Sequence, residues 1–440
     1  MKIRRRLLLE LLLYTLVLLG LGTLEGGILA LAIPLLLYLM GAWADAPSVL
    51  NLRARHTLRR RDARTAQPTE RVTEALPVVV ELTLTNQGDA LPQVHVTDQL
   101  PAGMELVAGE PSLLAPLASG ETLSLTYTVR GPRGSFNFQT VHVTARDPLG
   151  LVRRTRQLDA PAYLWVLPDV KRIKPVPIRP QQTHGFAGPI LSGQPGSGVD
   201  FYGVRAYHFG DSRHRINWRL TARHTDQLFT NQFEQERIAD VGLILDARAQ
   251  VNVQGAGNSL FEHGVQATAS LADAFLREGH RVALLIYGRA LERTFPGYGK
   301  MQRARILHAL AQARTGASMV FETFDYLPTR FFPAHSQLVI ISPLQPDDLS
   351  MLVRLRARGY HLLVISPDPV TYETRQLPTT ETTALAARIA RIERTLLLQQ
   401  LRKYDIRVVD WPVAASLDTV LQTALARPQR ARRASQRFAS

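Results

Sequence analysis

The sequence predicts three structured parts: two N-terminal transmembrane helices, a β-sandwich, and a C-terminal α/β domain with a doubly wound sheet. Three observations predict them. Residues 7–44 are almost uninterruptedly apolar. Residues 75–166 contain short runs in which apolar and polar residues alternate, the period of half-buried strands. Beyond residue 237 the apolar runs are continuous and separated by helical segments, as in a parallel sheet covered on both faces.

The apolar stretch predicts a transmembrane helical hairpin over residues 1–50. It is too long for one span of about 20 residues, and it divides at the glycines of residues 22–27. Basic clusters lie in residues 1–6 and 51–64, whereas the connecting turn has no Lys or Arg. The positive-inside rule then predicts a protein of the cytoplasmic membrane with both termini and all soluble domains in the cytoplasm. A cleaved signal peptide is the alternative, but its apolar region would be shorter, about 7–15 residues.

Residues 51–74 are expected to be a basic juxtamembrane linker, and residues 75–166 a sandwich of the immunoglobulin-like kind. The strands expected in this sandwich are residues 78–85, 94–97, 122–129 and 138–145. Residues 167–197, rich in Gly, Pro and Ser toward their end, are expected to be a second linker.

Residues 237–426 predict the α/β domain. Its expected strands are residues 241–246, 281–287, 337–342, 361–366 and 407–410. Residues 287–290 are too short for a crossover helix, so residues 291–295 should fold back as an antiparallel edge strand. A long amphipathic helix is expected over residues 382–404.

The net charge of +15 comes mainly from residues 1–6, residues 51–64 and a tail at residues 427–440. The tail carries five Arg and no acid, and we expect it to be disordered. The rest of the chain is nearly neutral, which disfavours a specific nucleic-acid interface. The chain has no cysteine, which excludes thiolate catalysis and cysteine metal sites.

Residues 198–236 hold a dense set of Arg, acidic and aromatic residues. The positions that stand out are Phe201, Gly203, Arg205, Tyr207, Gly210, Asp211, Arg215, Trp218, Arg223, Glu234 and Glu236. This segment resembles the signature of the bacterial family called domain of unknown function 58, with Asn217 and Arg219 in place of the usual Asp and Lys. Together with the predicted hairpin, sandwich and α/β domain, the resemblance covers most of the chain.

The arginines of this signature segment can form bidentate pairs with its acids. The segment could then act as a clamp that holds itself on the α/β sheet. It could instead be a partner-docking surface that uses Arg and Trp as anchors. No pattern in it indicates catalytic residues.

The order of elements in residues 237–426 resembles the von Willebrand factor A domain. That resemblance implies a metal-ion-dependent adhesion site at the carboxyl ends of the strands, made of carboxylates and hydroxyls that suit Mg²⁺. Here the site is degenerate. Asp246 is in place, but Arg248 and Gln250 stand at the two serine positions. Ser342 is followed by Pro343 rather than Asp, and Thr315 or Thr323 would supply the threonine. We therefore expect no bound metal, no cofactor, and a pair between Asp246 and Arg248 or another arginine.

These observations predict a non-enzymatic adaptor, anchored in the lipid bilayer, whose α/β domain recruits another protein. The family resemblance implies a MoxR-type AAA+ ATPase as the partner, in complex assembly or maturation. One alternative is a hydrolase of unknown substrate that uses the carboxylates of Asp211 and Asp246. The other is a nucleic-acid or anionic-lipid binder that acts through residues 427–440 with a steep salt dependence.

Overall fold

The structure is a computed structural model of residues 1–440. It describes residues 3–23, 30, 33–34, 36, 48–60, 69–74, 76–146, 153–178, 190–224, 226–255, 258–288, 290–317, 324, 327–328, 331–334 and 336–426. Within these ranges, the side chains of residues 3–10, 23, 190–200 and 234–237 are outside the description. The chain divides into two compact units, Met1–Leu167 and Pro168–Ser440.

The predicted transmembrane hairpin is wrong for this structure. Helix α1 (Ile3–Thr23) is followed by a strand-rich region, and no helix in the described part of the chain is both long and apolar enough to cross a membrane. The physical reason is charge within the helix. The 21 residues of α1 include Arg4, Arg5, Arg6 and Glu10, so its stretch without charged residues is residues 11–23, which rises roughly 20 Å against a hydrocarbon core of about 30 Å. Most of the second expected span, residues 27–43, lies outside the described residues.

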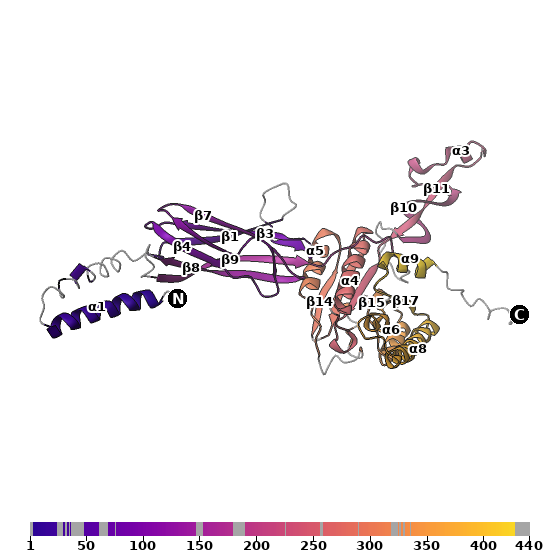
Figure 1. The fold of residues 1–440 in the computed structure, drawn as a ribbon. Coiled ribbons are helices and arrows are strands. Elements are labelled where there is room, and N and C mark those ends of the chain that lie inside the picture. Colours follow the sequence, from indigo (N-terminus) through magenta and orange to yellow (C-terminus); the bar gives the residue numbers. More distant parts are fainter. Residues whose placement is uncertain are drawn as a thin grey trace. The chain divides into compact units, whose positions relative to one another are not determined.

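The first unit contains two β-sheets that face each other across one apolar core (Figure 1). One sheet has the spatial order β1 (Leu52–Arg60), β3 (Val78–Asn86), β7 (Thr122–Arg130) and β5 (Glu105–Ala108). The other has the order β2 (Arg71–Thr73), β9 (Arg153–Leu167), β8 (Gly134–Arg146), β4 (Leu91–Asp98) and β6 (Ser112–Leu117). The described residues between 76 and 166 therefore form mainly strands, as the alternating pattern predicts.

The expected linker at residues 51–74 is replaced by two strands, β1 and β2. Leu52, His56 and Leu58 are buried, at even-numbered positions of β1. Arginines fill much of the opposite face of β1, and their charge hides this period-two pattern in the sequence. β1 pairs antiparallel with β3 and so completes the first sheet.

The second unit is built on a six-stranded sheet. Its order is β14 (Leu291–Gly297), β13 (Arg281–Tyr287), β12 (Asp240–Asp246), β15 (Gln337–Ile341), β16 (His361–Pro367) and β17 (Arg407–Trp411). All neighbouring pairs are parallel except β13 with β14, where the chain folds back as the short turn predicts. The carboxyl ends of β12, β15, β16 and β17 therefore meet at one edge of the sheet.

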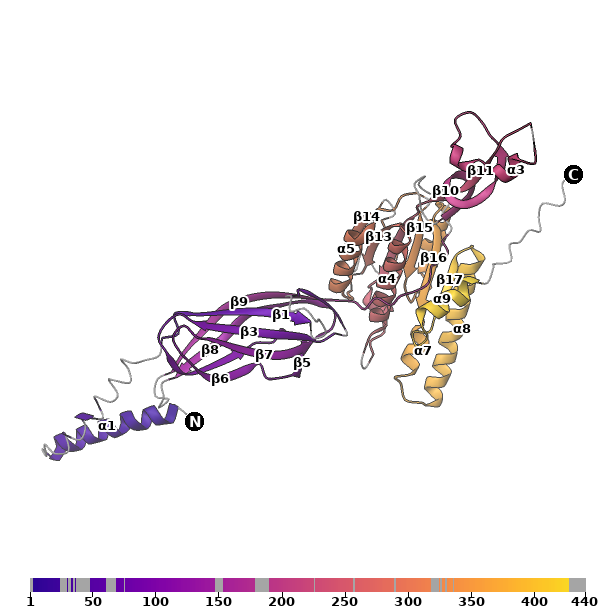
Figure 2. The same cartoon turned by 90° about the horizontal axis from the view of Figure 1, so that it is seen from above.

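Helices cover both faces of this sheet. α4 (Leu260–Arg277) and α5 (Gly299–Gln312) pack together on one face, where Gly264 of α4 approaches Leu245 and Ile341. α6 (Asp348–Ala357) and α8 (Glu381–Lys403) share a core with Ile244 and Ile340 on the other face. The short α7 (Pro369–Thr374) lies against α8, and α9 (Leu417–Ala426) packs on β17 (Figure 2).

A two-stranded hairpin precedes the six-stranded sheet. β10 (Ile190–Ala206) and β11 (Phe229–Arg237) pair antiparallel, with register shifts in the Gly- and Pro-containing part of β10. Between them lie the 3₁₀ turn η1 (Arg213–Arg215) and the short helix α3 (Trp218–Thr221). We call residues 190–237 the arm. The expected linker at 167–197 thus ends in a strand, whereas the tail at 427–440 lies outside the described residues.

Candidate functional site

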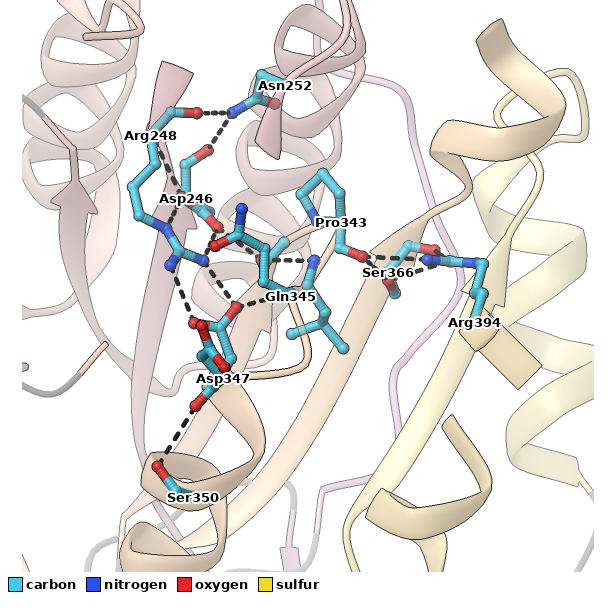
Figure 3. A network of polar contacts seen from close by, with 12 residues as sticks. Asp246, Arg248, Asn252, Pro343, Gln345, Asp347, Ser350, Ser366 and Arg394 are labelled. Atoms are coloured by element: carbon cyan, nitrogen blue, oxygen red, sulfur yellow. Dashed lines mark hydrogen bonds and ion pairs between the residues drawn. The ribbon is translucent and has the colours of Figure 1, made fainter. Parts of the chain in front are cut away.

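The carboxyl edge of the six-stranded sheet holds a buried arginine between two carboxylates (Figure 3). The predicted pairing of Asp246 with Arg248 is present, and Asp348 at the start of α6 completes a triad. The Arg248 Nε and Nη2 donate to the two Asp246 carboxylate oxygens at 3.0 and 2.7 Å. Its Nη1 and Nη2 donate to those of Asp348 at 2.9 and 2.8 Å. Both contacts are bidentate, the geometry that makes Arg–carboxylate pairs strong and directional.

Neighbouring groups fix each member of this triad. The Ser342 hydroxyl donates to Asp246 Oδ2 at 2.6 Å, and the backbone N–H of Gln345 donates to Asp348 Oδ2 at 2.8 Å. The Asn252 side chain donates to the backbone oxygens of Asp246 and Arg248. The triad therefore ties the end of β12 to the loop after β15 and to the first turn of α6.

The triad is shielded from solvent. Only 1 % of the Arg248 side chain is exposed, and its guanidinium carbon lies 4.2 Å from the ring centre of Phe324. Burial by itself disfavours the Arg248 charge, but hydrogen bonds and charge from Asp246 and Asp348 outweigh it and raise the pKa of Arg248. Burial raises the pKa of Asp348, against the opposing influence of the guanidinium. Arg248 therefore carries a permanent positive charge inside the domain.

These residues do not fit a metal ion. The guanidinium fills the space between the two carboxylates and contacts both, and its charge would repel a cation. Within the described ranges, no group of three or more His, Cys, Asp or Glu residues could hold a metal. Of the other predicted positions of this site, Gln250 is exposed in η2 (Ala249–Val251). Thr315 adjoins Gly316, whose backbone forms a β-bridge with that of Arg248. Thr323 lies outside the described residues.

A second arginine, Arg394 of α8, lies along the same edge and was not anticipated from the sequence. Its guanidinium donates to the backbone oxygens of Pro343 and Ser366 at 3.0 and 3.1 Å (Figure 3). It also donates to Asp410 Oδ1 at 2.7 Å. Arg394 therefore connects the ends of β15, β16 and β17. Arg248 and Arg394 together close the edge at which open α/β sheets commonly bind ligands.

The arm carries most of the predicted signature residues, and Arg205 and Asp211 form its main ion pair. Arg205 Nη1 and Nη2 donate to Asp211 Oδ2 and Oδ1 at 2.8 and 2.7 Å. The pKa of Asp211 lies below its ordinary value because of the hydrogen bond from Arg205 and a second from the His208 N–H. Tyr207 donates to the Asp211 carbonyl, and Gly210 adopts φ +103°, a conformation that suits glycine. These contacts fix the loop after β10.

Further contacts connect η1 and α3 to β11. The Thr230 hydroxyl donates to the Arg215 carbonyl at 3.2 Å, and the Arg215 guanidinium lies 5.2 Å from the ring centre of Phe233. Asn217 caps α3 by accepting from the Leu220 N–H, and its amide donates to Asn231 at 2.8 Å. Asn217, which stands where the family usually has Asp, therefore also forms a side-chain hydrogen bond to β11.

Large apolar side chains remain exposed on the arm. Phe209 is fully exposed, and Trp218 and Phe201 are 66 % and 62 % exposed. Arg213, Arg219 and Arg223, which lie in the same segment between β10 and β11, are exposed as well. Gly203 lies in β10 with open space around it, while the side chains of Asp200, Glu234 and Glu236 lie outside the description. The arm thus combines an internally fixed framework with an exposed aromatic and basic surface, which we call the arm tip (Phe209, Arg213, Trp218, Arg219 and Arg223).

Residues 203–385 match the family described as Protein of unknown function DUF58. The DUF58 match begins in β10 and ends in α8, so it includes the arm tip and the Arg248 triad. It does not extend over the first unit, so the family match is narrower than the resemblance drawn from the sequence.

Comparison with known proteins gives one curated relative and several distant structures. The chain is 29% identical over 199 residues to the "Uncharacterized protein YeaD" of Bacillus subtilis (strain 168), covering 44% of this chain and 47% of that protein. The chain thus spans about half the length of this relative.

Two solved structures illustrate how remote the structural likenesses are. A FixG-related protein from Vibrio parahaemolyticus has 12% identity and a TM-score of 0.17, with 26% of this chain and 95% of that chain covered. A GH20 exo β-N-acetylglucosaminidase from Vibrio harveyi has 11% identity and a TM-score of 0.18, with 84% and 78% covered. TM-scores this low carry no argument about the fold or function of this chain.

Proposed function

We propose that this chain is a non-enzymatic adaptor that binds another protein through the arm tip. The observation that supports this proposal is the exposure of Phe209 and Trp218 on a framework fixed by the Arg205–Asp211 pair. Exposed aromatics beside arginines have the composition of binding hot spots, and a rigid framework reduces the entropy lost on binding. Arg213, Arg219 and Arg223 favour an acidic partner surface.

The partner class we propose is a MoxR-type AAA+ ATPase, which is what resemblance to the DUF58 family implies. The strand order of the second unit and the position of Asp246 support the further resemblance to a von Willebrand factor A domain. Because Arg248 fills the position between the carboxylates, the proposed docking needs no metal-bridged contact to the partner. The hydrolase alternative gains no support from geometry, since Asp211 and Asp246 each pair with their own arginine.

The test is a titration of the full chain with the purified MoxR-type ATPase of the same organism, followed by calorimetry. Trp218→Ala and Phe209→Ala should each weaken binding by about tenfold or more, the loss typical of a hot-spot anchor. Tyr298→Ala is the matched control, because Tyr298 is a 72 % exposed aromatic residue outside the arm. If the wild-type chain does not bind the ATPase, the partner class is wrong. If both arm variants bind like wild type, the arm tip is not the docking surface.

A further inference from the structure

Helix α8 carries two apolar faces, and within the described part of the chain one of them is buried and the other is exposed. Ala387, Leu398 and Leu401 are buried against the sheet side. On the outward face, Leu385, Ile389, Ile392 and Leu396 are 60 %, 51 %, 53 % and 53 % exposed. Figure 2 shows α8 at the outside of the second unit. A continuous stripe of four large aliphatic residues is more than the scattered single apolar residues of an ordinary surface.

The spacing of this stripe is that of a coiled-coil seam. Its residues follow one another at intervals of four, three and four, which assigns Leu385 and Ile392 to heptad position d, and Ile389 and Leu396 to position a. Ala387, Arg394 and Leu401 then occupy position f, opposite the seam. Because the f positions face the domain, the a/d seam faces outward and is open to another helix.

The charges beside the seam select one kind of partner helix. Arg388 occupies position g and Glu393 occupies the following position e, and both side chains are exposed. Neither of these two side chains forms a hydrogen bond or ion pair within the described part of the chain. In a parallel pair, each g residue meets the e residue five positions later on the other helix, so Arg388 would meet Glu393 twice. In an antiparallel pair, like charges would meet instead.

We propose that α8 pairs with α8 of a second copy of this chain, parallel and in register. The two-fold axis then runs along the seam, Ile389 and Leu396 pack against their own copies, and two Arg388–Glu393 ion pairs flank them. The seam spans about two heptads, so we expect a reversible dimer whose population depends on concentration. This dimer uses none of the arm-tip residues.

The first test is sedimentation velocity of the full chain over a concentration series. Ile392→Glu should raise the dissociation constant by at least about tenfold, because it places a charge in the apolar seam. Ala384→Glu puts the same charge on the exposed surface of α8 outside the seam and should leave the constant unchanged. A chain that stays monomeric at every concentration overturns the proposal, as does an equal effect of both variants.

The second test separates the parallel arrangement from other partners. Arg388→Glu and Glu393→Arg should each weaken the dimer, because each replaces attraction by repulsion. The double variant should restore it, since the two charges are exchanged. Failure of the double variant to recover dimerisation overturns the parallel register.

The third test uses the absence of cysteine from the chain. Leu396→Cys places a thiol at an a position, where a parallel in-register pair brings it next to its own copy. Mild oxidation should then give a cross-linked dimer, whereas Ala384→Cys should stay monomeric on a denaturing gel. Equal cross-linking of both variants overturns the proposal.

Discussion

Each unit of the molecule contains a buried polar triad, and the two triads differ in how their charge depends on pH. In the second unit, Arg248 lies between Asp246 and Asp348. In the first unit, His56 Nε2 lies 2.7 Å from Asp98 Oδ2, and the Tyr127 hydroxyl donates to the same oxygen at 2.5 Å. Both triads connect elements far apart in the sequence.

The sandwich triad bridges the two sheets of the first unit. His56 and Tyr127 belong to β1 and β7 of one sheet, whereas Asp98 lies on β4 of the other. His56 Nδ1 also lies 2.6 Å from the Ala160 carbonyl of β9, and its ring centre is 5.5 Å from that of Phe138. Burial alone would lower the pKa of His56, but the hydrogen bond and charge of Asp98 outweigh it and raise the pKa.

Two triads with similar burial therefore stabilise their units in two different ways. Arginine stays charged at every accessible pH, so the triad in the α/β unit is a permanent link. Histidine titrates near neutrality, so the strength of the sandwich triad should change over the physiological range. Substitutions in the two triads should therefore differ in the size and pH dependence of their effects.

The largest effect is expected for Arg248→Met. It removes the guanidinium that lies between two buried carboxylates and should reduce the stability of the second unit by about 3–5 kcal/mol. Urea unfolding, followed by hydrogen exchange of peptides from β12 and β15, measures this loss. Arg375→Met, at an exposed arginine after α7, is the matched control and should change little.

A combined variant checks the cause. Replacing the whole triad by neutral groups, as Asp246→Asn, Arg248→Met and Asp348→Asn together, should cost less than Arg248→Met alone, because no buried charge is left without a partner. A larger loss in the triple variant would contradict this explanation.

A smaller loss is expected for His56→Leu. It removes one of the two side-chain hydrogen bonds to the Asp98 carboxylate, and should destabilise the sandwich by about 2–3 kcal/mol. Peptides from β1 and β4 should lose hydrogen-exchange protection, while peptides from β12 and β15 keep theirs. Unchanged hydrogen-exchange protection in β4 would show that His56 does not stabilise the contact between the two sheets.

The smallest effect is the pH dependence of the wild-type chain. The pKa of His56 is higher in the folded state than in the unfolded state, so protonated His56 contributes its full stabilisation below the unfolded pKa of about 6.5. This contribution is lost as the pH rises through the higher folded pKa. Hydrogen-exchange protection factors in β1 and β4, corrected for intrinsic exchange, should therefore fall as the pH rises through the folded pKa. In His56→Gln the dependence should flatten, and a wild-type profile that is flat or rises with pH would contradict the assignment.

The sequence predicted local structure well where one physical rule dominated. Continuous apolar runs located the strands of the six-stranded sheet, and the short turn at residues 287–290 fixed the antiparallel direction of β14. The Asp246–Arg248 pair followed from two residues close in sequence. The arginine-rich strand β1 was missed because the charge of its exposed arginines obscures the alternation. The N-terminal hairpin was inferred from hydropathy and flanking basic residues, but no helix in the described part of the chain is long and apolar enough to cross a membrane.

The amino-acid sequence alone was enough for the periodicities, and with them for the strands of the six-stranded sheet and the heptad spacing of Leu385, Ile389, Ile392 and Leu396. Which side chains meet depended on the tertiary fold. Asp348 is a hundred residues from Arg248, and Arg394 reaches carbonyls on two other segments. Periodicity is a property of neighbours along the chain, whereas a buried ion pair depends on how distant segments pack, and that packing also decides which face of α8 is left open.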